Sequence, residues 1–273
     1  MLAGCGNSSR GDTELRITRD FGQKSITASK TSELRPGATA LRQLQLEAKI
    51  DTAYSGRFIT GINGVKQNTG SGMDWLFYVD GVESNVGAGS WRLRDGEVVQ
   101  WDYHRWMDVQ TGGAIVGAFP RPLTSRGVQI ECADGSAAAC TKTRAAIDAP
   151  TTGKKRVRVR VGAWLGLASM KDIPNLSEGP AGNGAFAAIE PGRIDLVDQT
   201  GRISRTLGAG SGLVAAFKVG DDLQWVITGV DAAGVERAAG LLNEKTLGGR
   251  FAVAVGPDGQ TFSLPLVNSE PGG

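Results

Sequence analysis

Histidine and cysteine are scarce in this chain. Its 273 residues include one histidine, His104, and three cysteines, Cys5, Cys132 and Cys140. A Ser-His-Asp hydrolase would have to use His104, and two cysteines with one distant histidine do not complete a closed zinc site. No phosphate-binding loop and no dinucleotide-binding fingerprint occurs in the sequence. The sequence therefore predicts neither an enzyme nor a metal site, with carboxylate-based glycoside hydrolysis left as the open alternative.

Long apolar runs and strong charge are also missing. No run reaches the roughly 18 apolar residues that a transmembrane helix needs. The net charge is only +2, and the densest basic run, residues 154–160, alternates with valine. That alternation favours a strand with a solvated face over a nucleic-acid footprint. Nucleic acid is therefore not an expected partner.

Glycine, in contrast, is plentiful. The 40 glycines follow no fixed period, which is typical of many tight turns between short strands. Strand patterns surround one helix pattern early in the chain, and a second set of short strands with one or two helices follows. This order predicts an α+β protein of two small domains. The expected division is a tether over residues 1–12, a first domain over 13–107, a linker over 108–122 and a second α+β domain, a sandwich of short strands and helices, over 123–273.

Aromatic side chains concentrate in residues 72–106, which hold four of the six tryptophans. Two strands are expected there, over 75–80 and 98–106, and their alternation places aromatic side chains on both faces. A core needs only one such face, so the other is a candidate binding surface. The candidate ligand-binding residues are Trp75, Tyr78, Trp91, Tyr103, His104 and Trp106. Trp75 and Tyr103 also suit a core, together with Phe77 and Trp101, whereas Trp91, His104 and Trp106 are expected to line the exposed surface.

Several short segments of this part carry a family resemblance. They read YSGRF at 54–58, ING at 62–64, WLFYVDG at 75–81, LRDGE at 93–97 and VQWDY at 99–103. Together they resemble the transcobalamin C-terminal-like domain, which bacteria carry as a domain of unknown function on secreted and lipid-anchored proteins. The resemblance covers roughly residues 13–107, with Glu97 in place of a more usual aspartate.

This resemblance implies a fold and a ligand. The implied fold is a small β-grasp-like mixed sheet packed on one helix. The implied ligand is a corrinoid, one face of which the module covers in vertebrate cobalamin carriers. Those carriers cover the other face with a separate helical barrel, and this sequence has no pattern of that kind.

The first residues carry a second resemblance. Leu2-Ala3-Gly4-Cys5 resembles the lipobox of bacterial lipoproteins. It implies a basic and an apolar segment ahead of the box, cleavage before Cys5 and acylation of its thiol, and two acyl chains would anchor the protein stably. The remaining Cys132 and Cys140 are expected to form a disulfide, which suits an exported protein. The expected location is the extracytoplasmic face of the membrane, or secretion.

Two functional hypotheses follow. The first is a lipid-anchored binding protein without a resident cofactor, which captures a flat, partly apolar ligand, a corrinoid by resemblance, and passes it to a membrane transporter. The second is an envelope interaction module that binds a protein partner or a wall polymer through a sheet edge or face. A concave aromatic pocket would favour the first hypothesis, and a fully packed aromatic cluster would favour the second.

Overall fold

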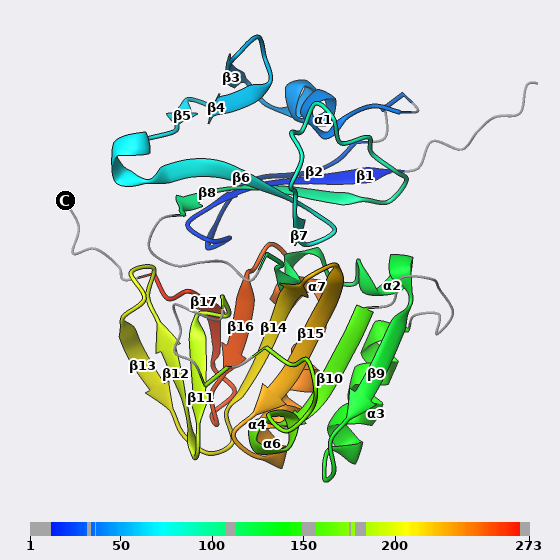
Figure 1. The fold of residues 1–273 in the computed structure, drawn as a ribbon, viewed down its shortest axis with the longest axis vertical. Coiled ribbons are helices and arrows are strands. Elements are labelled where there is room, and N and C mark those ends of the chain that lie inside the picture. Colours follow the sequence, from blue (N-terminus) through cyan, green and yellow to red (C-terminus); the bar gives the residue numbers. More distant parts are fainter. Residues whose placement is uncertain are drawn as a thin grey trace, which may run out of the picture.

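The structure, a computed structural model, describes residues 12–31, 34–35, 37–106, 113–148, 157–174, 176–177 and 184–267. It is a mixed α+β fold, as the sequence predicts. Residues 12–106 form a first region and residues 113–267 a second region, which lie one above the other in Figure 1. No helix within the described residues is long and apolar enough to cross a membrane.

The first region is built on a five-stranded sheet in the order β2-β1-β8-β6-β7. Its strands are β1 (Thr13–Arg19), β2 (Lys24–Thr31), β6 (Met73–Val79), β7 (Val82–Glu83) and β8 (Val98–Arg105). Strand β1 runs parallel to β8, whereas β6 and β8 are antiparallel. The sheet is therefore mixed, as expected.

One helix and a small second sheet cover one face of this sheet. Helix α1 (Ala40–Glu47) begins after Thr39, whose side chain accepts a hydrogen bond from the Arg42 N–H. The small sheet consists of β3 (Ile50–Ala53), β4 (Phe58–Ile62) and β5 (Val65–Lys66), and a short 3-10 turn, η1 (Thr69–Ser71), leads from it to β6. We call this side the helix face, and its core includes Leu15, Leu44, Trp75 and Trp101.

The second region contains a six-stranded sheet in the order β17-β16-β14-β15-β10-β9. Its strands are β9 (Val128–Cys132), β10 (Val157–Ala163), β14 (Gly212–Val219), β15 (Asp222–Gly229), β16 (Ala252–Val255) and β17 (Thr261–Leu264). Helices α3 (Ala137–Ile147) and α6 (Ala232–Gly240) pack on this sheet. A three-stranded sheet stands beside it, formed by β11 (Ala187–Glu190), β12 (Arg193–Val197) and β13 (Ile203–Leu207). Short helical turns complete the region: η2 (Val116–Ala118), α2 (Leu123–Arg126), α4 (Trp164–Leu167) and α7 (Glu244–Leu247).

The described part of the expected linker, residues 113–122, is not a solvated spacer. Ile115, Val116 and Phe119 are buried. The Ile115 N–H donates to the Gly81 carbonyl of the first region, and the Val116 N–H donates to the Phe251 carbonyl of the second. These residues thus connect the two regions as a packed segment, because an apolar segment next to two sheets buries itself between them.

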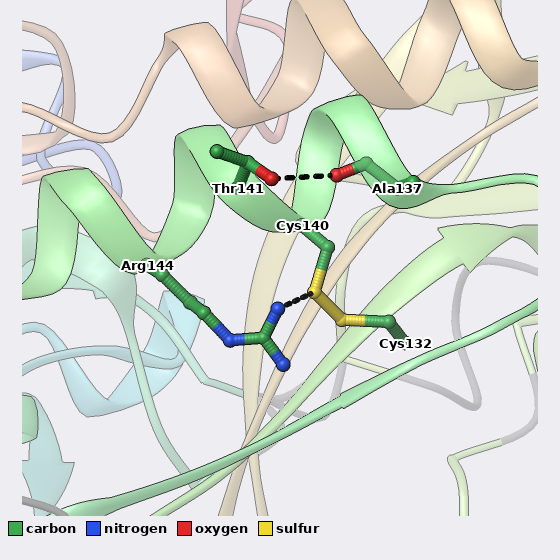
Figure 2. Close-up of a disulfide and its surroundings, with 5 residues drawn as sticks. All are labelled: Cys132, Ala137, Cys140, Thr141 and Arg144. Carbon is green, nitrogen blue, oxygen red and sulfur yellow. Dashed lines mark hydrogen bonds between the residues drawn. A yellow bond between two sulfur atoms is a disulfide. The ribbon is translucent and has the colours of Figure 1, made fainter.

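A disulfide joins Cys132, at the end of β9, to Cys140 in α3, with their Cα atoms 6.2 Å apart. Figure 2 shows the bond and the Arg144 guanidinium, whose Nη1 lies 2.8 Å from Cys140 Sγ. The expected cysteine pairing is confirmed, and it is compatible with an extracellular location. Cys5, the expected lipidation site, lies outside the described residues.

Candidate functional site

The face of the five-stranded sheet opposite α1 is covered by the second region, as Figure 1 shows, and we call it the docked face. Tyr78 on β6 is 0% exposed and His104 on β8 is 1% exposed. The Phe251 ring of the second region lies 5.3 Å from each of their rings, between ring centroids. The expectation that His104 lines an open surface is therefore wrong, because the chain's own second region occupies that side of the sheet.

Asp102 organises the polar part of the docked face. Its carboxylate is fully buried and accepts hydrogen bonds from the Phe21 N–H at 3.0 Å, the Gly22 N–H at 2.8 Å and the Thr18 hydroxyl at 2.5 Å. It also lies 2.7 Å from Nδ1 of His104. Nε2 of His104 is buried and has no hydrogen-bond partner among the described residues. This network fixes the turn between β1 and β2 against β8.

That turn is also where the two regions meet. Gln23 Nε2 donates to the carbonyls of Ser263 and Pro265, at 3.0 and 2.9 Å. Gln100 Nε2, from β8, donates to the Gly249 carbonyl at 2.8 Å. A Cβ atom on Gly22 would lie 1.9 Å from the same carbonyl oxygen, so the backbones approach as closely as glycine allows. These contacts join the regions into one unit and leave no room for a ligand between them here.

The helix face is different, because it opens at the edge of β6. A cavity of about 270 Å³ lies there, and we call it the edge hollow. Phe77 stacks on Trp101 in its floor, with ring centroids 4.8 Å apart and planes 23° from parallel. Phe58 on β4, which is 42% exposed, stands at its rim. The residues that line the edge hollow are Leu41, Arg57, Phe58, Ile59, Asp74, Trp75, Leu76, Phe77, Glu83, Ser84, Gly87, Ala88, Gly89 and Trp101.

Charged groups of both signs border the edge hollow. Arg57 is exposed, and Asp74 and Glu83 are partly buried. Burial raises the pKa of Asp74 above its ordinary value of 3.8, and the hydrogen bond from the Trp75 N–H and the nearby His104 oppose that rise. The lining contains no histidine and no cysteine. The arrangement can hold a flat apolar group on the aromatic floor and polar groups at the mouth.

The six ligand-binding residues predicted from the sequence lie in different parts of the structure. Trp75 lines the edge hollow. Tyr103 lies beside it, with ring centroids 5.2 Å apart, and its hydroxyl donates to the Lys66 carbonyl. Trp91 is partly buried, with Nε1 3.3 Å from Glu97 Oε2, and Trp106 is 52% exposed at the end of β8. Tyr78 and His104 lie on the docked face, so the six residues do not form one site.

Several residues of the edge hollow were not predicted from the sequence as site residues. Phe77 and Trp101 were assigned to the core in preference to a site, and Arg57, Phe58 and Asp74 were not proposed as site residues. A signal existed for the hairpin at residues 54–58, which belongs to the family resemblance. Nothing in local periodicity, however, places Phe58 next to Phe77, because that contact depends on how the small sheet lies across β6.

A second cavity, of about 310 Å³, lies between β1 and the segment of η2 and α2. Arg16 and Arg121 line it, together with Glu14 and Glu244. Arg16 is already paired with Glu14, and Arg121 with Asp80 at 3.1 Å. Its cations are thus satisfied within the protein, and the edge hollow is the better candidate site. In the described part of the chain, no group of three or more His, Cys, Asp or Glu side chains could hold a metal ion.

Comparisons with known proteins match part of the chain. The family model "Domain of unknown function (DUF4430)" matches residues 37–105. A crystal structure of a "putative metal binding protein" from Ruminococcus gnavus aligns with a TM-score of 0.29 and 14% identity, over 35% of this chain and 97% of that one. No curated protein matches the chain. Part of the first region is thus similar to a domain family of unknown function, and the family match does not name transcobalamin.

Proposed function

We propose that this chain is an extracytoplasmic binding protein that takes a small, partly apolar ligand into the edge hollow. The observation that carries the proposal is the stacked Phe77–Trp101 floor beneath an exposed Phe58, in a cavity that opens on a rigid sheet. Aromatic floors with a few polar groups at the mouth are typical of ligand sites.

The size of the cavity constrains the ligand. Ligand pockets usually measure about 300–1,000 Å³, and the edge hollow, at about 270 Å³, is close to the lower end. A corrinoid remains the ligand that the transcobalamin resemblance suggests. A complete corrinoid is larger than this cavity, so the edge hollow would hold one edge or one side chain of it.

Two further features support an exported carrier. The Cys132–Cys140 disulfide suits an oxidising compartment. The lipobox-like sequence at Cys5 suits acylation and a membrane anchor. In this proposal the anchored protein holds its ligand at the membrane surface and hands it to a transporter.

Titration of the purified protein with cobinamide and cobalamin tests the proposal, with heat and tryptophan fluorescence as readouts. We expect saturable quenching of the Trp75 and Trp101 emission, because both lie in the cavity. The substitution Phe58→Ala should weaken binding about tenfold, since an aromatic contact is worth about 1.4 kcal/mol. Tyr54→Ala is the matched control, because Tyr54 is 81% exposed and does not line the edge hollow.

The outcomes test the proposed corrinoid ligand and the proposed binding site separately. Absence of heat and of quenching with both corrinoids at high micromolar concentration would end the corrinoid version. Equal effects of Phe58→Ala and Tyr54→Ala on whichever ligand binds would end the assignment to the edge hollow.

A further inference from the structure

The edge of β6 is open along one short stretch of the edge hollow. Odd-numbered residues of β8 bond toward β1, as the Asp20 N–H does to the Tyr103 carbonyl at 2.9 Å. Even-numbered residues of β8 bond toward β6, as the Asp80 N–H does to the Val98 carbonyl at 2.8 Å. Trp75 and Phe77 face the odd-numbered Tyr103 and Trp101. The peptide groups of Trp75 and Phe77 therefore point away from β8, toward the outer edge of the sheet.

Two of the four hydrogen-bonding groups on this edge are already used. The Trp75 N–H donates to its neighbour's carboxylate, Asp74 Oδ1, at 2.7 Å. The Phe77 carbonyl accepts from the Ser84 N–H at 3.0 Å. Among the described residues, no hydrogen bond to the Trp75 carbonyl or from the Phe77 N–H is found. One acceptor and one donor, two residues apart, thus remain at the edge hollow.

This pair matches one amino-acid unit. When a residue pairs with a strand in the parallel direction, its N–H donates to the carbonyl of the residue that precedes its partner on the strand. Its carbonyl accepts from the N–H of the residue that follows this partner. A unit facing Leu76 would therefore donate to the Trp75 carbonyl and accept from the Phe77 N–H. A longer strand is blocked on both sides, by Asn68 bridged to Met73 and by Ser84 bonded to Phe77.

The group that precedes the bound N–H lies opposite Trp75. Side chains of Trp75 and Phe77 share the helix face, where the Phe77–Trp101 stack and Phe58 form the aromatic part of the cavity. An apolar acyl group attached to that nitrogen would meet this aromatic surface. The open edge of β6 thus favours an amide group, and the Phe77–Trp101 floor favours an apolar chain next to that amide.

We infer that the ligand of the edge hollow is an N-acyl amino acid or the acylated end of a short peptide. Its amide N–H donates to the Trp75 carbonyl, its next carbonyl accepts from the Phe77 N–H, and its acyl chain covers the Phe77–Trp101 stack. This inference rests on the proposed function, because it names the ligand class of the same cavity.

N-butanoyl-leucine amide is the probe that tests it, and the ¹⁵N-labelled full chain gives the readout. We expect saturable binding and a shift of the Phe77 amide resonance, because that N–H gains an acceptor. The matched analogue methylated on the leucine nitrogen lacks the donor and should bind about tenfold more weakly, since a net hydrogen bond is worth about 1–1.5 kcal/mol. N-acetyl-leucine amide lacks two CH₂ groups and should bind at least tenfold more weakly, at about fourfold for each CH₂.

Several outcomes would overturn the inference. Equal affinity of the methylated analogue, or an unmoved Phe77 resonance, would remove the amide contact. Equal affinity of a blocked pentapeptide with leucine at its centre would show that the open edge is not limited to one amino-acid unit. If cobinamide binds in a Phe58-dependent manner and the acyl amides do not, the inference fails and the proposed function stands. If neither class binds, both fail.

Discussion

The two faces of the five-stranded sheet both carry aromatic side chains, but different parts of the chain cover them. The helix face bears Trp75 and Phe77 of β6 and Trp101 of β8, whereas the docked face bears Tyr78 of β6. The docked face is closed by the second region, whereas the helix face keeps a cavity at its edge. Alternation along a strand therefore shows that both faces are covered, and it does not show by what.

The difference lies in the polar residues that accompany the aromatic ones. Gln100, Asp102 and His104 alternate with the aromatic residues of β8 and lie on the docked face. Buried polar groups need partners, and a neighbouring backbone can supply them. Gln100 and Gln23, in the turn held by Asp102, donate to backbone carbonyls of the second region. On the helix face the cover is one short helix and a small sheet, which does not reach the whole edge of β6.

The largest effect should come from separating the docked face from its cover. Gly22→Ala would place a Cβ atom 1.9 Å from the Gly249 carbonyl oxygen, at a φ of +74°. We expect the free energy of unfolding to fall by about 4 kcal/mol or more, because backbone must move to relieve the clash. Urea denaturation followed by circular dichroism measures it.

Gly56→Ala is the control for this substitution. Gly56 has a similar φ of +81°, and a Cβ atom there would meet nothing within 4 Å. Only the conformational cost of about 1–2 kcal/mol applies. Equal losses in the two variants would show that the regions are not held in contact at Gly22.

A smaller loss should follow from removing the carboxylate that orders the docked face. Asp102→Ala leaves the N–H groups of Phe21 and Gly22 without their acceptor. We expect a loss of about 3 kcal/mol in the free energy of unfolding, since buried donors without partners are costly. Faster hydrogen exchange at Phe21 and Gly22, with little change at Trp101, would locate the effect on the docked face. The exposed Asp95→Ala serves as the control, and a loss there as large as that of Asp102→Ala would contradict the assignment.

The smallest effect should arise at Asp74, on the open edge. Its pKa is raised in the folded protein, so the folded state holds the proton more tightly than the unfolded chain does. The stability that this gives is fully present below pH 3.8 and is lost as the pH rises through the folded pKa. Asp74→Asn does not ionise and keeps an oxygen for the Trp75 N–H. We expect the variant to be slightly more stable than the parent at pH 7, with the difference vanishing below pH 3.8 in thermal unfolding curves. A variant less stable than the parent at pH 7 would contradict the direction of the shift.

Much of the fold could be predicted from the sequence. The α+β class follows from one helix pattern among many short strands, and the two aromatic strands appear as β6 and β8. The pairing of Cys132 with Cys140 follows from the cysteine count, once Cys5 is assigned to the lipobox-like sequence. The family resemblance is supported at the coarser level of a domain of unknown function over residues 37–105. These features depend on neighbours in the chain, which a sequence pattern records directly.

The candidate site could be predicted only in part. Trp75 was found because aromatic alternation marks its strand. Phe58 and Ser84 join it through contacts between separate elements, which no local pattern encodes. His104 was misplaced for the same reason, since its cover includes Phe251, far along the chain. Periodicity identifies a buried face, and the identity of its partner depends on the tertiary fold.

The contact between Gln23 and the carbonyls of Ser263 and Pro265 has a consequence for biosynthesis. A growing polypeptide reaches Ser263 only 240 residues after Gln23. Until then Tyr78, Leu76 and Phe21 lack the aromatic neighbours that cover them in the finished molecule, and such transiently bare surface attracts other chains. The nascent chain therefore exposes this apolar surface until residues 251–265 have been synthesised and have folded onto it.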